Sequence, residues 1–255
     1  MKEKTSIVIC AYNEEPTIED VVSKCREYNP ESELIVVDDG SQDKTEEILR
    51  SLNKKMDFRY IRLDENQGKS NAMVLGVQKA ERDIILFFDA DVSGIKKEHF
   101  DQLLSPLGDE ADMVLGSPSE TLIDYRVNPF KSLTGERAMY KKDLEPILVN
   151  IQDIRFGVET YINLYFQAHG KKIKYTLLDG LTHPTKYDKT SADKATREFI
   201  NEGKEIAVTL LKNYDLITQR ISNSFGEQGD SIKDSLKKLQ KDLNEKIQVL
   251  LRNNG

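Results

Sequence analysis

The first half of the chain alternates short apolar runs with amphipathic stretches. Apolar runs of this kind predict buried strands, and apolar positions three and four residues apart predict helices. The predicted strands are residues 6–11, 34–37, 58–63 and 84–88, and the predicted helices are residues 16–29, 44–52 and 70–80. Strands that alternate with helices predict an α/β fold, with a mostly parallel sheet that carries helices on both faces.

The second half has a less regular pattern. Residues 113–116 and 173–178 predict further strands, and a helix is expected after Gly157. Beyond residue 190 the chain is expected to be helical to its end, apart from a break near residues 226–229. Apolar residues recur there at three- and four-residue steps: Ile232, Leu236, Leu239, Leu243, Ile247 and Leu250. We therefore expect an α/β domain over residues 1–188 and a helical extension over residues 189–255, whose stripe packs on the domain, a second chain or a membrane surface.

Composition narrows the class of protein. The chain has 255 residues and a net charge of -7, and an acidic protein is unsuited to nucleic acid as its main partner. Its two cysteines form no disulfide framework, which fits a reducing cytoplasm. The apolar stretch after the first four residues is too short for a signal peptide, and no run approaches the roughly 20 apolar residues of a membrane span. A cytoplasmic protein is expected, and peripheral contact with a membrane stays open.

The segment Asp89-Ala90-Asp91 follows the predicted strand 84–88 directly. Carboxylates two residues apart on a strand point the same way, and they suit Mg²⁺ or Mn²⁺ with positions left for phosphate oxygens. The segment also matches the first half of an EF-hand calcium loop. However, Phe100 stands where that loop needs a bidentate glutamate, so a calcium loop is rejected. A turn or helix-capping role is the alternative for both aspartates.

Polar groups follow the other predicted strands too. Asn13-Glu14, Asp38-Asp39 and residues 66–69 each come after a strand, and ligands bind parallel sheets outside the carboxyl ends of the strands. A carboxylate there can accept from a ribose hydroxyl or a base imide, although a plain strand-to-helix turn explains Asp38-Asp39 equally well. Lys69 at a helix start can reach a phosphate. A P-loop is excluded, because Leu63 occupies the position of its first glycine.

Three histidines occur in the chain. His183 lies just beyond the predicted strand 173–178 and is a candidate metal ligand, although a lone histidine is more often structural. His99 lies in a charged helical stretch and His169 near a helix end, so both are expected to be solvated.

Four motifs together resemble family 2-like glycosyltransferases of the GT-A fold. They are residues 8–15, 36–45, 66–69 and 89–91, in the order and spacing of that family. The resemblance covers roughly residues 5–95, and it implies a UDP- or GDP-sugar donor with Mg²⁺ or Mn²⁺. The nucleotide-sugar contacts that it implies are Ala11, Tyr12, Glu14, Asp39, Gly68, Lys69 and Asp89, and the implied metal contacts are Asp91 and Asp89.

A second resemblance covers residues 133–189, which look like glucosyl-3-phosphoglycerate synthases and related soluble bacterial transferases. It implies that Gly135, Glu136 and Arg137 line the acceptor site, and that His183 completes the metal site. Arg137 stands where an aromatic residue is common, so the acceptor stays unidentified. If the enzyme inverts configuration, Glu159 or Glu136 is the candidate base. If it retains configuration, the departing phosphate serves as the base and Glu159 positions the acceptor; alternatively, Glu159 only stabilises a helix N-terminus.

The resemblance therefore predicts a glycosyltransferase, and a hexosyltransferase is the expected kind. Two other classes of function stay open. A nucleotidyltransferase of related α/β architecture would release pyrophosphate instead of a nucleoside diphosphate. A non-catalytic scaffold would bind nucleotide or glycan and oligomerise through its C-terminal helix.

Overall fold

A seven-stranded sheet forms the centre of the protein, with strand order β3-β2-β1-β4-β6-β5-β7. The structure is a computed structural model that describes residues 1–118, 134–152, 154, 157–183, 209 and 212–225. The strands are β1 (Thr5–Ala11), β2 (Glu33–Asp38), β3 (Arg59–Arg62), β4 (Ile84–Phe87), β5 (Met113–Pro118), β6 (Arg137–Tyr140) and β7 (Ile173–Leu178). Strands β3, β2, β1 and β4 run parallel, whereas β6 is antiparallel to both of its neighbours, β4 and β5. The predicted mostly parallel α/β fold is confirmed, but β6 was not predicted.

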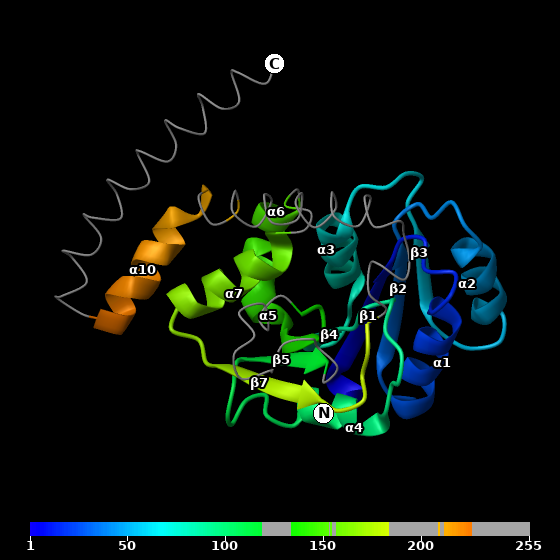
Figure 1. Ribbon diagram of the computed structural model, residues 1–255, viewed down its shortest axis with the longest axis horizontal. Coiled ribbons are helices and arrows are strands. Elements are labelled where there is room, and N and C mark those ends of the chain that lie inside the picture. The colour runs from blue at the N-terminus through cyan, green and yellow to red at the C-terminus, as the bar shows by residue number, and fades with distance from the viewer. Residues whose placement is uncertain (119–133, 153, 155–156, 184–208, 210–211, 226–255) are drawn as a thin grey trace, which may run out of the picture.

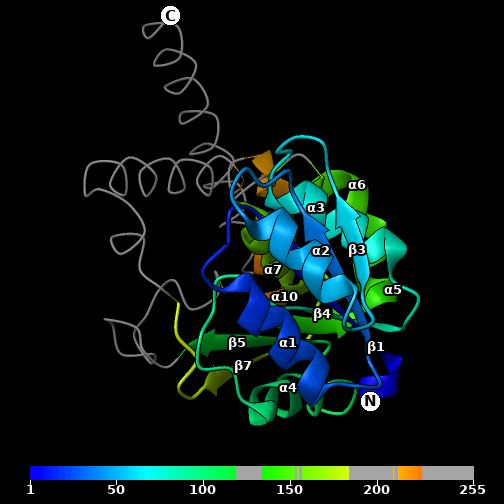
Figure 2. The ribbon, with the colours of Figure 1, turned by 90° about the vertical axis from the view of Figure 1, so that its right-hand side faces the viewer.

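Helices cover both faces of this sheet (Figures 1 and 2). The longer ones are α1 (Ile18–Tyr28), α2 (Thr45–Asn53), α3 (Lys69–Lys79), α4 (Lys97–Leu104), α7 (Val158–Ala168) and α10 (Tyr214–Phe225). Short turns of helix lie at η1 (Lys2–Lys4), α5 (Lys141–Leu144), η2 (Glu145–Ile147) and α6 (Leu148–Ile151). Helices α1, α2 and α4 pack in one apolar core, and α3, α6 and α7 pack in the other.

The alternation of side chains along β1 builds both cores. Ile7 and Ile9 point to the α1 side, and Val8 points to the α3 side, as successive residues of a strand must. Gly76 of α3 faces Val8 so closely that a methyl group at Gly76 would overlap the valine side chain. This close approach seats α3 against the sheet and fixes the position of its N-terminus, where Lys69 lies.

Part of the predicted C-terminal extension packs on the α/β domain. Helix α10 lies against α7, and Leu216 of α10 joins the same core. The predicted amphipathic stripe over residues 232–250 lies outside the described residues. Among the helices described, none combines the length and the apolar character that crossing a bilayer would require.

One expectation about the histidines is wrong. His99 is 1% exposed, not solvated, because it lies on the buried side of α4. Its Nδ1 accepts a hydrogen bond from the Lys96 backbone N–H, and its Nε2 lies 3.0 Å from the Asp179 carbonyl oxygen. These contacts tie α4 to the turn that follows β7. His169 is exposed, as predicted.

Candidate active site and metal centre

The carboxyl ends of β1, β2 and β4 meet at one edge of the sheet. Asp39 and Asp89 therefore emerge on the same side, the first after β2 and the second shortly after β4. Strand β6 runs the opposite way, and its first residue, Arg137, pairs with Phe87 at the end of β4. Glu136, which precedes β6, is thereby brought to the edge where Asp89 lies. The predicted convergence of the strand-end motifs is confirmed.

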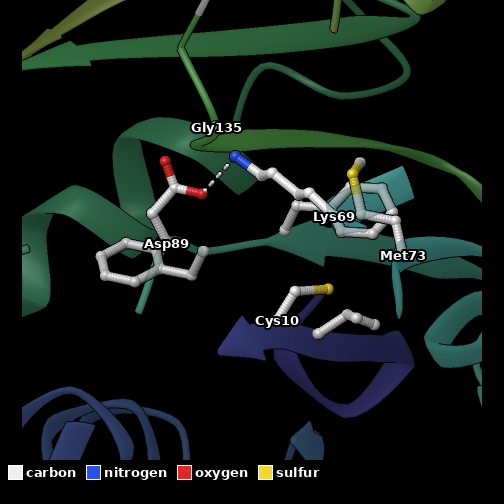
Figure 3. A pocket seen from close by; sticks show the side chains of 8 residues that line it. Cys10, Lys69, Met73, Asp89 and Gly135 are labelled. Carbon is white, nitrogen blue, oxygen red and sulfur yellow. Dashed lines mark hydrogen bonds and ion pairs between the residues drawn. The ribbon is translucent and has the colours of Figure 1, made fainter. Parts of the chain in front are cut away.

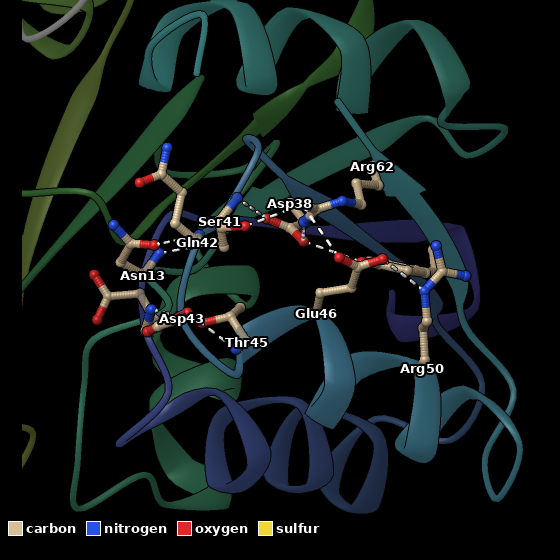
Figure 4. Close-up of polar contacts among 11 residues, drawn as sticks. Asn13, Asp38, Ser41, Gln42, Asp43, Thr45, Glu46, Arg50 and Arg62 are labelled. Atoms are coloured by element: carbon tan, nitrogen blue, oxygen red, sulfur yellow. Dashed lines mark hydrogen bonds and ion pairs between the residues drawn. The ribbon is translucent and has the colours of Figure 1, made fainter. Parts of the chain in front are cut away.

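The loops after β1 and β2 are held together by side-chain to backbone hydrogen bonds (Figure 4). Asn13 donates its N–H to Ser41 Oγ at 3.0 Å and accepts from the Gln42 N–H through Oδ1 at 2.7 Å. Glu14 donates its N–H to Thr45 Oγ1 at 2.9 Å. Asn13 adopts a left-handed backbone with φ 58°, a conformation that asparagine tolerates better than most residues. The motif residues after β1 and β2 therefore form a single frame.

Two adjacent carboxylates at the end of β2 have different partners. Asp38 is fully buried and accepts from the Ser41 N–H, from the Tyr60 hydroxyl at 3.0 Å and from the Arg62 guanidinium. Asp39 turns the other way, and its two carboxylate oxygens accept the N–H groups of Gln67 at 2.8 Å and Gly68 at 2.9 Å. Asp38 thus supports the sheet end, while Asp39 holds the loop that leads to Lys69. Tyr12, the first residue after β1, is 40% exposed and available to a ligand.

Lys69 joins two acidic residues across the site. Its Nζ lies 2.9 Å from Asp89 Oδ1 and 2.8 Å from Glu159 Oε1, in the first turn of α7. Burial opposes the ammonium charge, but the two carboxylates outweigh it and hold the pKa of Lys69 well above its usual value. Lys69 and Asp89 line a small pocket with Cys10, Met73 and Gly135 (Figure 3). Cys10 is no candidate nucleophile, because burial raises the pKa of its thiol and keeps it protonated.

Gly135 packs directly on the carboxylate of Asp89. A methyl group at Gly135 would overlap both carboxylate oxygens. A side chain at this position would therefore displace Asp89, and only glycine allows the segment before β6 to approach this closely.

His183 reaches the site through a short antiparallel bridge. Ser93 and Thr182 exchange two backbone hydrogen bonds, of 2.9 and 3.0 Å, between the loop after β4 and the turn after β7. Asp91 lies two residues before this bridge and His183 lies one residue after it. As a result, His183 Nδ1 is 3.3 Å from Asp91 Oδ1 although the two residues are far apart in sequence.

The ligand atoms of Asp89, Glu136 and His183 lie within 4.8 Å of one another, close enough to hold a metal ion. Burial opposes protonation of the imidazole, but Glu136 and Asp91 raise the pKa of His183 to about 11. Burial also raises the pKa of Asp89, against the influence of Lys69. Glu136 loses solvation as well, yet His183 and the Thr134 hydroxyl hold the pKa of its carboxyl below the usual value. The cluster thus combines the carboxylates of Asp89, Asp91 and Glu136 with one imidazole.

These residues suit Mg²⁺ or Mn²⁺. Carboxylate oxygens are the ligands that both ions prefer, and an imidazole nitrogen favours Mn²⁺ further. Glu136 is fully buried, and its Oε1 has no hydrogen-bond partner among the described residues. A buried carboxylate oxygen without a donor is costly, and positive charge held nearby, on the imidazole or on an ion, would reduce that cost.

Two of the expected acceptor contacts are enclosed in the protein. Arg137 is fully buried, and its guanidinium donates to the Thr134 carbonyl oxygen and to Asn163 Oδ1, on α7. In this structure the guanidinium of Arg137 therefore contacts protein groups, and the acceptor contact expected of it stays a prediction. Glu136 is equally enclosed, with Oε2 3.5 Å from His183 Nε2, and its role as a catalytic base stays a prediction. Glu159 and Gly135 stay at the edge beside Asp89.

Sequence reasoning missed the role of Thr134, whose Oγ1 lies 2.6 Å from Glu136 Oε2. It also assigned Glu136 to the acceptor side and not to the metal cluster. The sequence signal that could have revealed both roles is that Thr134, Gly135 and Glu136 are consecutive. Because Gly135 packs on the Asp89 carboxylate, the residues on either side of Gly135 lie near the same site.

The sequence of this chain matches a described protein family over most of its length. The sequence model described as "Glycosyl transferase family 2" matches residues 6–169. The poly-beta-1,6-N-acetyl-D-glucosamine synthase of Staphylococcus epidermidis is 38% identical over 91 residues, which cover 35% of this chain and 22% of that protein. The Staphylococcus aureus synthase is 37% identical over 90 residues, with the same coverage of 35% and 22%. The chain therefore matches less than a quarter of the length of these relatives.

Among solved structures, the chain is similar to glucosyl-3-phosphoglycerate synthase from Mycobacterium tuberculosis. Its complex with Mn²⁺, UDP and glucosyl-3-phosphoglycerate has a TM-score of 0.64 and 21% identity, and the match covers 82% of this chain and 79% of that one. The complex of the same synthase with Mg²⁺ and UDP has a TM-score of 0.64 and 22% identity, and the match covers 82% of this chain and 78% of that one. This likeness establishes the shared GT-A fold.

Proposed function

The chain belongs to glycosyltransferase family 2, and from this premise we propose that it transfers a sugar from a UDP- or GDP-sugar donor to an acceptor in a metal-dependent reaction. The observation that carries the proposal is that Asp89, Asp91 and His183 lie together at one edge of the sheet. Glu136 and Lys69 lie beside them. A nucleotide-sugar diphosphate carries the negative charge that such a site, once it holds a divalent cation, would bind. The structurally similar synthase binds UDP with Mn²⁺ or Mg²⁺, which supports the same cofactors here.

The metal site is proposed to consist of Asp91 and His183, with Asp89 at its inner side. A bound Mg²⁺ or Mn²⁺ would stabilise the charge that grows on the nucleoside diphosphate as it departs. Lys69 adds a second positive charge next to Asp89, held in place before the reaction begins, as electrostatic catalysis requires.

The nucleoside is proposed to lie on the frame formed by the loops after β1 and β2. Tyr12 offers an exposed ring, Asp39 holds the adjoining loop through the Gln67 and Gly68 N–H groups, and Glu14 belongs to the same frame through its bond to Thr45. Ala11 and Gly68 would contribute backbone at the same edge. The residues that hold this frame together, from Asn13 to Thr45, would keep it open without a ligand.

Glu159 is the carboxylate proposed to meet the acceptor hydroxyl. It is 6% exposed and lies across Lys69 from Asp89, so it borders the place where the sugar would sit. In an inverting enzyme Glu159 would take the proton, and in a retaining enzyme it would orient the acceptor. Gly135 would line the acceptor side, whereas Arg137 would act by fixing Asn163 and the Thr134 carbonyl behind it.

Donor hydrolysis tests the proposal. We expect purified protein to release a nucleoside diphosphate from UDP- or GDP-sugars with Mn²⁺, and Asp91→Ala to abolish this release while the far-ultraviolet circular dichroism stays unchanged. The matched control is Asp109→Ala, which removes an exposed aspartate and should retain full activity. Release of pyrophosphate would instead support a nucleotidyltransferase. Lack of binding of both UDP and GDP in calorimetry with Mn²⁺ would contradict the proposal and favour a scaffold that binds neither nucleotide.

Location and assembly remain predictions of the sequence. A cytoplasmic location and peripheral contact with a membrane are proposed on composition alone. Oligomerisation through the stripe after residue 231 concerns residues outside the described part of the chain. A light-scattering mass that is unchanged in a variant ending near residue 222 would contradict the oligomer.

A further inference from the structure

The carboxylate of Glu136 has fewer hydrogen-bond donors than a buried anion needs. Its Oε2 lies 2.6 Å from Thr134 Oγ1, but the same hydroxyl lies 2.5 Å from the Gly116 carbonyl oxygen. One hydroxyl has one proton, so the two acceptors compete for it. Oε1 has no partner among the described residues, and the side chain is fully buried. Glu136 therefore requires a further donor.

His183 is the neighbour that can supply a donor to Oε2, the oxygen for which the Thr134 hydroxyl is shared. Its Nε2 lies 3.5 Å from Glu136 Oε2, at the outer limit of a hydrogen bond, and its Nδ1 lies 3.3 Å from Asp91 Oδ1 on the other side of the ring. The nearby cations have other partners: Lys69 binds Asp89 and Glu159, and the terminal nitrogens of Arg137 donate to Asn163 Oδ1 and to the Thr134 carbonyl oxygen. The Nε of Arg137 has no partner among the described residues, and Glu136 is not among the acceptors of this guanidinium. The imidazole is thus placed between two carboxylates.

The two sides of this ring differ in their access to solvent. The side chain of Glu136 is 0% exposed, whereas those of His183 and Asp91 are 30% and 31% exposed. A diphosphate that approaches from solvent can reach an ion on the Asp91 side of the ring. It cannot reach one that lies beneath the ring next to Glu136.

We propose that Glu136 is a positioning residue that accepts a hydrogen bond from Nε2–H of His183 and thereby presents Nδ1 to the metal on the Asp91 side. The inference rests on the proposed function and adds the tautomer and the ligating atom. Histidines that bind metals generally donate their other ring N–H to a carboxylate or carbonyl, which fixes the tautomer and the ring orientation. The competing arrangement makes Glu136 itself a ligand, with the metal on Nε2, because those atoms also lie within 4.8 Å.

Nuclear magnetic resonance of the histidine side chains distinguishes the two arrangements. The full-length protein labelled with ¹⁵N-histidine contains three imidazoles, and His183→Gln identifies the signals of interest. In this experiment ¹¹³Cd²⁺, added together with UDP, would serve as the diamagnetic probe ion. The expected result is a scalar coupling from ¹¹³Cd to Nδ1 of His183, with the proton on Nε2. Coupling to Nε2, with the proton on Nδ1, would overturn the inference while leaving the proposed function intact.

Metal affinity supplies the second measurement. Glu136→Gln should weaken Mn²⁺ binding in the presence of UDP by about 10- to 100-fold, the usual effect of losing such a partner. The control, Glu110→Gln, changes an exposed glutamate in the same way and should leave the affinity unchanged. An unaltered affinity in folded Glu136→Gln would overturn the positioning role. Absence of Mn²⁺ binding in the wild-type protein would overturn the proposed metal site itself. If the variant does not fold, the coupling measured in the wild-type protein decides the question.

Discussion

Replacing Lys69 with methionine removes the ammonium group that holds both Asp89 and Glu159. In the structure its Nζ lies 2.9 Å from one carboxylate and 2.8 Å from the other. Methionine keeps the length and apolar character of the stem but not the charge. The two carboxylates would then lie in a poorly solvated site without their shared cation, since their side chains are only 17% and 9% exposed.

The size of the effect follows from burial. Removing one partner of a fully buried ion pair costs about 3–5 kcal/mol. The side chain of Lys69 is itself 31% exposed, so solvent would screen part of the change. We therefore expect Lys69→Met to lower the free energy of unfolding by about 2 kcal/mol near neutral pH. Denaturant titration followed by circular dichroism measures this difference.

The loss should depend on pH. The pKa of Asp89 is already raised in the folded protein, and Lys69 opposes that rise. Without the ammonium, the folded-state pKa of this carboxyl rises further above its unfolded value. An acid with a raised folded pKa destabilises the protein above its unfolded pKa, and the penalty shrinks as pH falls toward that value. The difference from wild type should therefore be smaller at about pH 5.5 than at about pH 7.5.

A matched variant and a double mutant isolate the cause. Lys174→Met removes a surface lysine that pairs with Glu110, and it should cost less than about 1 kcal/mol. In the double variant with Glu159→Gln, the two losses should be less than additive, because the second substitution removes an anion that the first left unpaired. The reasoning is refuted if Lys69→Met costs no more than Lys174→Met, or if its cost is the same at both pH values.

Two further substitutions test the way in which the site is supported. Gly135→Ala introduces a methyl group that overlaps the Asp89 carboxylate, so we expect Mn²⁺ affinity to fall at least tenfold and stability to fall by about 1–3 kcal/mol; an unchanged affinity in calorimetry would contradict this. His99→Leu removes the contact with the Asp179 carbonyl and should cost about 1–3 kcal/mol in denaturant titration. The same substitution should also weaken Mn²⁺ binding, because Asp179 belongs to the turn that leads to His183. A loss of stability with unchanged Mn²⁺ affinity would contradict this link between His99 and the metal site.

The parallel half of the fold follows from local pattern. Ile7 to Ala11 and Ile84 to Phe87 are apolar runs that end at polar motifs, and each pairs with its neighbour in the same direction. Since parallel strands end at a common edge, the meeting of Asp39 and Asp89 could be predicted without coordinates. The resemblance of these motifs to a family then added the nucleotide sugar.

The antiparallel strand β6 could not be predicted in this way. Its four residues, Arg137 to Tyr140, begin with a charged side chain that is fully buried, so the run does not have the apolar character of an inner strand. The charge is accommodated by Asn163 and by the Thr134 carbonyl, partners that only the folded chain brings near. The acceptor contact expected of Arg137 came from the resemblance of residues 133–189 to a family and not from the pattern of this strand.

His99 shows the same limit on a smaller scale. Charged neighbours made its helix look solvated, yet the histidine lies on the apolar side next to Phe100 and Leu103. Its partner, the Asp179 carbonyl, lies on a turn that is distant in sequence. Buried polar groups that find long-range partners leave no periodic signal. That explains why Glu136 and Thr134 were also placed only by the structure.

The central claim is that the cluster around Asp91 supports metal-dependent release of a nucleoside diphosphate from a nucleotide sugar. The most direct measurement follows UDP and GDP release from a panel of UDP- and GDP-sugars with and without Mn²⁺, for the wild-type protein and for Asp91→Ala. We predict release by the wild type only when the metal is present, and none by the folded variant. Release that is equal without metal, or equal in Asp91→Ala, would contradict the account.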